Sequence, residues 1–371
     1  MPDLYVAGAK ADITPPVGIA MDGYSARPNP STGIHDRLYS RVLLLRANGK
    51  TFAVISCDLC WLGDTTVAEV RERAKAIGVD EVLLTATHTH SGPAMADFIV
   101  GPRMLEAEYV LSLPSQIIDA VKSASQQLRP VTAVVSAGET NLSVNRRMSS
   151  LPVDHTVVSL AFQDDEGKPA AEVLNYACHP TVLGPPNRQI SADYPGRLSE
   201  IVEGSRGGAY VSLFLNGACG DVNPSTCDGY HCEGTFADVS TMARRLAAAS
   251  LDSSDGTPFG CSEIRFERSR VGPLPPWGLS FELTAMNMGG VALLAAPGEL
   301  FASTGLWLRR KFSPLPLLIV GFANGYAGYF PTKDSFDRRD YETKRICWVD
   351  ASAEEVIRSE ATALIEKTGH G

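Results

Sequence analysis

Pairs of short hydrophobic runs separated by polar turns recur along the chain. In the first pair, the runs 41–47 and 51–57 flank an Asn-Gly dipeptide at 48–49, which is typical of two-residue β-hairpins. In the second pair, the runs 156–162 and 171–177 flank an acidic turn and predict another hairpin. Hairpins join antiparallel strands, so we expect the β-sheets to be mixed rather than purely parallel.

A change in hydrophobic spacing follows the first hairpin. Hydrophobic residues recur at helical intervals over 65–77 and stop at Gly78, and the run 81–87 then predicts a buried strand. A strand, a helix and a second strand in this order form a βαβ unit, in which the two strands are parallel. Because ligands collect beyond the carboxyl ends of such strands, Asp58 and His88 lie where chemistry is expected.

The rest of the chain continues the alternation of helices and strands. Further helices are predicted over 105–128 (with Pro114 inside), from Asp193 as N-cap to about Glu203, over 236–250 and over about 353–367. Further strands are predicted at 131–137, 210–215, 261–267, 279–286, 291–295 and 315–321. No internal repeat or long linker is present, so we expect residues 1–371 to form a single α/β domain with mixed β-sheets covered by helices.

Composition excludes several classes of protein. Of the 371 residues 44% are hydrophobic and 20% are charged, which excludes disordered and low-complexity chains. The net charge of −9, without a basic cluster, argues against nucleic acid as a partner. The sequence has neither a run of about 18 hydrophobic residues nor a signal peptide, so we expect no integral membrane segment and a cytoplasmic location. It carries no information on the oligomeric state.

Eight cysteines are spread along the chain, and two of them, Cys57 and Cys60, have CxxC spacing. Cys227 and Cys232 are too far apart to form the second pair of a zinc ribbon. In a long chain without an export signal, free thiols are the expected state. We therefore expect reduced, buried cysteines that pack as small hydrophobic residues.

The most specific local pattern is the motif THTHSGP at 87–93. His88 and His90 are separated by one residue, so on an extended chain they point to the same side, about 6.6 Å apart. This arrangement suits one metal ligand beside one group that hydrogen-bonds substrate or water; two solvated imidazoles are the alternative. His179 also follows a predicted strand. Alone it would be typical of a satisfied core residue, but three histidines at strand ends favour one shared site.

In several motifs the sequence resembles the N-terminal catalytic domain of the neutral, non-lysosomal ceramidases. The motifs are AGAKADIT at 7–14, GY at 23–24, GIHDRLYSR at 33–41, THTHSGP at 87–93, NR at 145–146, HPT at 179–181, GDV at 220–222, PGE at 297–299 and YAGY at 326–329. Their order and spacing extend over almost the whole chain. The resemblance implies the fold of that domain and one bound zinc ion.

By motif, the zinc ligands of the family fall on His88, His179, Glu299 and Tyr329. Two neutral imidazoles, a carboxylate and a phenol oxygen leave a position for water, as a catalytic zinc requires. Without the resemblance, Glu299 after Pro-Gly would be interpreted as an acid at a helix N-terminus, and Tyr329 as an aromatic residue of a loop.

The resemblance also implies roles for residues that do not bind the metal. His90 matches a second active-site histidine, which hydrogen-bonds substrate or moves a proton. Arg146 matches an arginine that holds a substrate oxygen, and Tyr341 a tyrosine that donates to the developing oxyanion; a salt bridge and a packed aromatic ring are the alternatives. Asn223 stands where the family motif GDVSP has its serine, which excludes a serine acyl-enzyme and leaves an amide that can position substrate.

These residues together predict a zinc-dependent hydrolase that cleaves a carboxamide bond in a small-molecule substrate through a metal-activated water. We do not expect ceramide itself, because the sequence ends before the immunoglobulin-like domain of the ceramidases and has no secretion signal. An ester or lactone is the alternative substrate, since it passes through the same tetrahedral intermediate. A non-catalytic family member, in which Asn223 marks lost activity, is the remaining alternative.

Four arginines lie in or near the loops that are expected to form the pocket walls: Arg27, Arg103, Arg147 and Arg338. They point either to a polar or anionic substrate or to a solvated surface. The sequence does not identify the acyl group or the amine or alcohol group of the substrate.

Overall fold

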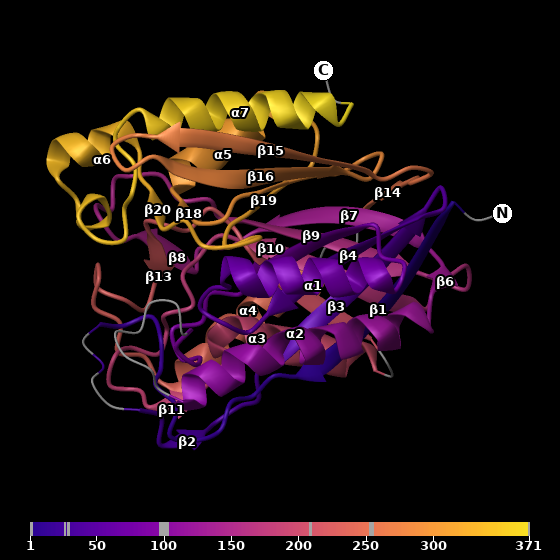
Figure 1. Cartoon of the computed structure of the whole chain (residues 1–371), viewed down its shortest axis with the longest axis horizontal. Coiled ribbons are helices and arrows are strands. Elements are labelled where there is room, and N and C mark those ends of the chain that lie inside the picture. The colour runs from indigo at the N-terminus through magenta and orange to yellow at the C-terminus, as the bar shows by residue number, and fades with distance from the viewer. Residues whose placement is uncertain are drawn as a thin grey trace.

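Two five-stranded sheets form the centre of the computed structural model, which describes residues 3–25, 27, 30–95, 104–207, 210–251 and 256–369 (Figure 1). The first has the order β5-β4-β3-β1-β6, with β1 Leu4–Asp12, β3 Tyr39–Ala47, β4 Lys50–Cys57, β5 Glu81–Ala86 and β6 Arg129–Pro130. The second has the order β12-β10-β9-β7-β14, with β7 Thr132–Glu139, β9 Thr156–Gln163, β10 Pro169–Tyr176, β12 Val211–Asn216 and β14 Thr257–Phe259.

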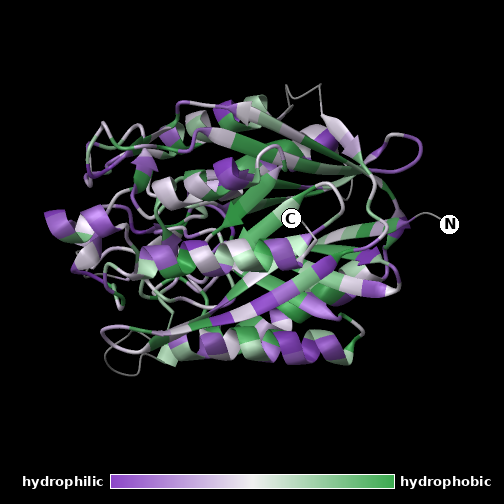
Figure 2. Cartoon of the chain, turned by 90° about the horizontal axis from the view of Figure 1, so that it is seen from above, coloured by the Kyte–Doolittle hydropathy of each residue, from purple (hydrophilic) through white to green (hydrophobic). Residues whose placement is uncertain are grey.

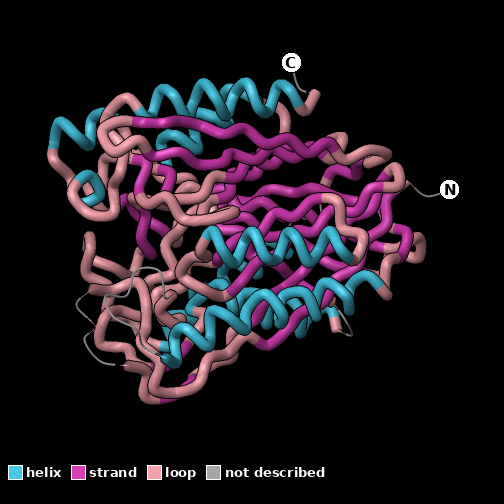
Figure 3. The backbone as a smooth tube through the Cα atoms, viewed as in Figure 1, coloured by secondary structure: helices cyan, strands magenta, loops and turns pink. Residues whose placement is uncertain are grey.

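The remaining strands form smaller sheets. A four-stranded sheet has the order β15-β16-β17-β19, with β15 Arg265–Leu274, β16 Leu279–Asn287, β17 Ala292–Ala295 and β19 Leu317–Val320. The two-stranded pairs are β2 Gly33–Ile34 with β11 Gln189–Ile190, β8 Ser143–Asn145 with β13 Val222–Pro224, and β18 Glu299–Leu300 with β20 Tyr329–Phe330. Figure 3 shows that loops gather at the end of the molecule where the last two pairs lie.

Helices cover the outer faces of the sheets. They are α1 Asp64–Ala76, α2 Met104–Ser125, α3 Asp193–Arg206, α4 Phe236–Leu251, α5 Ala302–Phe312, α6 Lys333–Arg338 and α7 Ala353–Lys367, with a 3₁₀ helix at Tyr341–Thr343. Buried clusters join α1 and α2 to the first sheet, α3 and α4 to the second, and α5 and α7 to the four-stranded sheet. Figure 2 shows hydrophobic stretches along the interior strands, polar stretches along strands nearer the surface, and helices that alternate between polar and hydrophobic residues. No helix in the described ranges is long and hydrophobic enough to cross a membrane.

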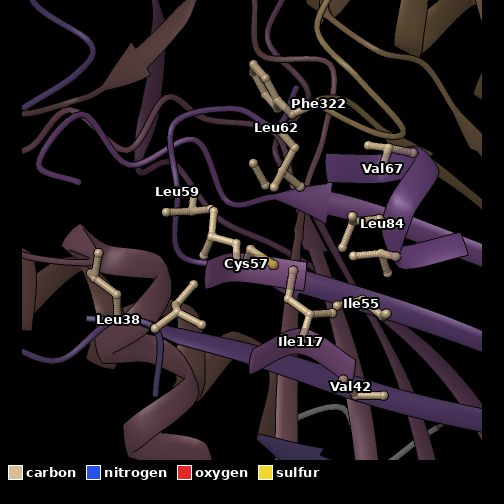
Figure 4. Packing of buried hydrophobic residues seen from close by; sticks show 14 of the residues in the cluster. Leu38, Val42, Ile55, Cys57, Leu59, Leu62, Val67, Leu84, Ile117 and Phe322 are labelled. Carbon is tan, nitrogen blue, oxygen red and sulfur yellow. The ribbon is translucent and has the colours of Figure 1, made fainter. Parts of the chain in front are cut away.

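The alternation of side chains along β3 explains why the first sheet is buried on both faces. Val42 and Leu44 pack into the cluster that includes residues of α1 and α2, which Figure 4 shows around Val42, Ile55 and Ile117. Leu43 and Leu45 point the other way, into the cluster shared with the second sheet. Because both faces of β3 are buried over 42–45, consecutive positions there are hydrophobic instead of every second one.

The pairing of strands confirms the prediction of mixed sheets. In the first hairpin β3 and β4 are antiparallel, and Ala47 lies opposite Lys50 across a turn in which Asn48 and Gly49 both have positive φ, 47° and 73°. β4 and β5 are parallel, as are β10 and β12. The α/β fold class with mixed sheets covered by helices is thus confirmed.

The predicted N-terminus of α3 was wrong. Asp193 does not cap α3; Ala192 is the N-cap, and Asp193 is the first helical residue with a φ of 53°. Its carboxylate instead accepts hydrogen bonds from the backbone N–H groups of Leu183 and Tyr194, at 3.0 and 2.7 Å, and so ties a loop to the helix.

The expectation of free thiols fails at one turn. Cys227 and Cys232 are joined by a disulfide, which closes the turn around residues 228–231. Cys57 and Cys60 remain free and buried, as expected. The CxxC spacing therefore marks two packed thiols, and the wider pair is the one that forms the cross-link.

Candidate active site

His88 lies just after β5, and one of its ring nitrogens, Nε2, points towards Glu299. Its backbone has a φ of 72°, an uncommon conformation for a residue with a side chain. The Nδ1–H group donates to the carbonyl oxygen of Cys60 at 2.6 Å, and the ring stacks on Phe322 with centroids 3.9 Å apart. These contacts fix the ring and leave Nε2 available for another partner.

His179 is held in the same manner after β10. It is fully buried, and its Nδ1–H group donates to the carbonyl oxygen of Cys219 at 2.7 Å. Its Nε2 atom lies 3.0 Å from Oε2 of Glu299, and Nε2 of His88 lies 3.9 Å from the same oxygen. The two histidines therefore converge on one carboxylate.

Glu299 and Tyr329 come from neighbouring strands. They lie directly opposite each other in the parallel pair β18 and β20, and both side chains are buried. The hydroxyl group of Tyr326 donates to Oε1 of Glu299 at 2.6 Å, and Nη2 of Arg146 donates to the hydroxyl oxygen of Tyr329 at 3.1 Å. Tyr326 was not predicted as a site residue, although its motif YAGY places it three residues before Tyr329.

The structure brings together a buried group of possible metal ligands. One ligand atom each of His88, His179 and Glu299 lies within 4.8 Å of the others. Cys60, His88 and His90 form a second group that meets the same distance limit, but it shares His88 with the first. Because Nδ1 of His88 is bonded to a carbonyl oxygen, only its Nε2 is available, and that nitrogen points to Glu299 and His90.

His90 lies beside this group, although the chain does not extend as a strand through residues 88–90. The Nε2 atoms of His88 and His90 are 3.1 Å apart and the ring centroids 4.7 Å apart, closer than on an extended chain. The ring makes a T-shaped contact with that of Tyr24, with centroids 4.8 Å apart. Its buried Nδ1 has no hydrogen-bond partner within the described part of the chain.

Arg146 is buried, and its guanidinium contacts protein oxygens as well as the imidazole of His179, whose Nε2 atom lies 3.4 Å from Nη1. Its Nε donates to Glu342 at 2.7 Å, its Nη2 to the carbonyl oxygen of Gly220 at 2.8 Å, and its Nη1 to Oδ1 of Asn223 at 3.4 Å. Asn223 in turn donates to the carbonyl oxygen of Gly229 at 3.0 Å. Arg146 therefore holds the phenol of Tyr329 in place, and Asn223 contacts Arg146.

A cavity of about 420 Å³ opens onto this centre. Its wall includes His88, His90, Glu299, Tyr329 and Tyr341, whereas His179, Arg146 and Asn223 are not among the described residues that line it. The side chain of Tyr341 is 48% exposed, and its ring lies 6.5 Å from that of Tyr329. The other predicted site residues are buried behind or along this cavity, and Tyr341 stands at its exposed edge.

The four arginines singled out in the sequence have different surroundings. Arg27 lines the cavity. Arg147 pairs with Asp221 at 2.7 Å, and Arg338, the last residue of α6, is partly exposed and pairs with the nearby Asp334 and Asp340. Arg103 lies outside the described residues.

Burial keeps the imidazoles of the centre neutral. Desolvation lowers the pKa of His88 to about 4 and that of His179 to about 3, with the charge of Arg146 adding to the effect at His179. Desolvation and the neighbouring imidazoles also lower the pKa of His90 well below its ordinary value. Neutral imidazole is the form that binds a metal ion.

These pKa shifts predict how the stability of the metal-free protein depends on pH. The unfolded chain takes up a proton on histidine near pH ~6.5, whereas folded His88 does so only near pH 4 and His179 near pH 3. Stability is therefore greatest above pH ~6.5 and falls as the pH drops towards 4, by up to about 1.4 kcal/mol per pH unit for each imidazole. Urea unfolding at a series of pH values measures this slope. A slope that the His88→Gln variant leaves unchanged would contradict the assignment.

Comparison with known proteins identifies relatives along most of the chain. Residues 5–254 match the family model described as neutral/alkaline non-lysosomal ceramidase, N-terminal. A neutral ceramidase from Pseudomonas aeruginosa is 22% identical over 481 aligned residues, covering 96% of this chain and 72% of that protein. Neutral ceramidase B from Dictyostelium discoideum is 27% identical over 265 residues, covering 62% of this chain and 36% of that protein. The chain thus spans about a third of the Dictyostelium relative.

Solved structures show the same fold. A ceramidase complexed with C2 superposes with a TM-score of 0.86 at 19% identity and covers 100% of this chain and 76% of that one. The neutral ceramidase from Pseudomonas aeruginosa gives a TM-score of 0.85 at 20% identity, covering 99% and 75%. Because the family model covers more than half of the sequence, the chain belongs to the neutral/alkaline non-lysosomal ceramidase family.

Proposed function

We propose that the protein is a zinc-dependent hydrolase that cleaves carboxamide bonds in small molecules. The observation that carries this proposal is the buried group formed by His88, His179 and Glu299, whose ligand atoms lie within 4.8 Å of one another beside a cavity. Two neutral nitrogens and a carboxylate in such an arrangement are typical of catalytic zinc sites. Membership of a family of hydrolases supports the same conclusion.

The chemistry of the donor set fits zinc. The Nδ1 atoms of His88 and His179 are bonded to backbone carbonyl oxygens, which orients the Nε2 atoms as ligands. Tyr326 holds Glu299 and Arg146 holds Tyr329, so both oxygen donors are also fixed. A zinc ion in this position would act as a Lewis acid: it would polarise a carbonyl oxygen and lower the pKa of a bound water molecule to about 7.

The remaining residues bind the substrate and move protons. Nε2 of His90 lies 3.1 Å from Nε2 of His88, next to the proposed ligands, so His90 is suited to accept the proton of the attacking water and pass it to the leaving amine. Tyr341, on the cavity wall, donates to the oxyanion that develops on the carbonyl. Arg146 keeps the phenol of Tyr329 in position, and Asn223 contacts Arg146. Because the proposed nucleophile is a water molecule, no serine is required at residue 223.

An amide is favoured over an ester or lactone because of His90. An amine is a poor leaving group and needs a proton before the carbon–nitrogen bond breaks, whereas an alkoxide from an activated ester does not. The neutral, buried imidazole beside the cavity supplies a group that can carry this proton.

Metal removal tests the proposal. We expect the purified protein to contain about one zinc ion per chain and to hydrolyse N-acyl amides in a panel of amides, esters and lactones. Dialysis against dipicolinic acid should abolish turnover, and added zinc should restore it. Circular dichroism before and after dialysis shows whether the fold survives. Zinc-loaded, folded protein that turns over no substrate in the panel would overturn the proposal.

A further inference from the structure

Arg27 lies on the cavity wall with part of its guanidinium group unused. The side chain is only 8% exposed, and Nη1 donates to the carbonyl oxygens of Asp22 and His90 at 3.0 and 2.8 Å. Nε donates to the carbonyl oxygen of Pro185 at 3.4 Å. Nη2 is buried, and among the described residues it has no hydrogen-bond partner. Two N–H donors are therefore left without an acceptor.

The charge of Arg27 is also left without a hydrogen-bonded counter-charge. Its contacts are with carbonyl oxygens, which orient the guanidinium but carry no net charge. Asp22 is the nearest acid in the sequence and attracts Arg27 electrostatically, but its carboxylate makes its hydrogen bonds with the indole N–H of Trp61 at 2.5 Å and the backbone of Gly23 at 2.8 Å. Desolvation lowers the pKa of Arg27 below its ordinary value. A buried cation in this state is stabilised by an anion.

The position of the guanidinium is fixed relative to the reaction centre. It lies over the ring of Tyr24, 4.9 Å from the centroid, and the same ring makes a T-shaped contact with His90 at a centroid distance of 4.8 Å. Arg27 also bonds to the backbone of His90, whose imidazole is 3.1 Å from that of His88. An anion on Nη2 would therefore lie on the side of the cavity where His90 stands.

We infer that the cavity selects amides whose amine portion carries a carboxylate, which Nη2 of Arg27 binds; N-acyl amino acids are the simplest members of this class. The inference rests on the proposed function, in which His90 serves the leaving amine and so marks its side of the cavity. Water adds to the amide carbonyl carbon, the carbon–nitrogen bond breaks, and the nitrogen takes up a proton. The products are a carboxylic acid and a free amino acid.

Binding of a matched pair of probes tests the subsite without turnover. N-(methylsulfonyl)glycine and its primary amide have similar shapes, lack a hydrolysable acyl group and differ in one negative charge. We expect zinc-loaded wild-type protein to bind the acid at least about tenfold more tightly than the amide in titration calorimetry. Arg27→Gln should abolish this preference, and Arg27→Lys should retain part of it. Arg197→Gln, a control in an exposed arginine of α3, should leave it unchanged.

The outcomes separate the subsite from the catalytic proposal. Equal affinity of wild-type protein for the two probes, or a preference that persists in the folded Arg27→Gln variant, would overturn the inference even if amides are hydrolysed. A preference that depends on Arg27, in a protein that hydrolyses no amide, would support the subsite and overturn the proposed function. Thermal melting and zinc content of each variant show that the fold and the centre are intact.

Discussion

Replacing His179 by alanine will remove the zinc ion and lower kcat/KM for amide hydrolysis by at least about a thousandfold. His179 is fully buried, and its Nε2 lies 3.0 Å from Glu299, so alanine at this position removes one of the proposed metal ligands. Loss of several kcal/mol of transition-state stabilisation corresponds to a rate change of this size. Elemental analysis and steady-state kinetics on the same preparation measure both effects.

A second histidine gives the matched control. His155 immediately precedes β9, is partly exposed, and lines a different cavity from the one beside the ligand group. His155→Ala should keep both zinc and activity. If the folded His179→Ala protein retains one zinc ion per chain and the wild-type rate, the assignment of the metal ligand is wrong.

The second large effect is expected at His90. We expect His90→Ala to lower the rate of amide hydrolysis by about 10²–10⁴-fold while largely preserving hydrolysis of an activated ester with the same acyl group. The reason is that only the amine needs a proton to leave, and His90 is the imidazole of the cavity that the proposed metal ligands do not include. Rates on the two substrates, measured with one enzyme preparation, give the comparison.

The control for this variant is its zinc content, which should remain that of the wild-type protein because His88, His179 and Glu299 are unchanged. Tyr24→Phe is a second control. It keeps the ring that packs against His90 and removes only a hydroxyl group bonded to the carbonyl oxygen of Leu183. Equal losses on amide and ester in His90→Ala would show that the residue positions substrate rather than carrying the proton.

Local hydrophobic patterns predicted the strands that are buried on both faces and the long helices. The runs 41–47 and 51–57 lie within β3 and β4, and the helical spacing over 65–77 corresponds to α1 within one residue at each end. The strand β18 could not be found in this manner, because two residues carry no periodicity. Its existence depends on pairing with β20, in which the partner of Glu299 is Tyr329, 30 residues later in the sequence.

The residues of the candidate site also divide into those that local sequence patterns identify and those that they do not. His88 and His179 were found from their places after strands, which is local information. Glu299 and Tyr329 were assigned only through the family resemblance, since each lies in a strand of two residues. The role of Arg27 depends on contacts with Pro185 and His90, which are distant in the sequence, so no local pattern distinguishes it from the other arginines.

The register between Glu299 and Tyr329 has a consequence for the assembly of the chain. The two histidines fall within residues 5–254, which match the family model, whereas Glu299 and Tyr329 lie beyond them in a strand pair of only two residues each. An ion bound by the two histidines, Glu299 and Tyr329 would cross-link the amino-terminal two thirds of the protein to its carboxyl-terminal third. Metal affinity and the docking of these two portions are then thermodynamically linked, each strengthening the other.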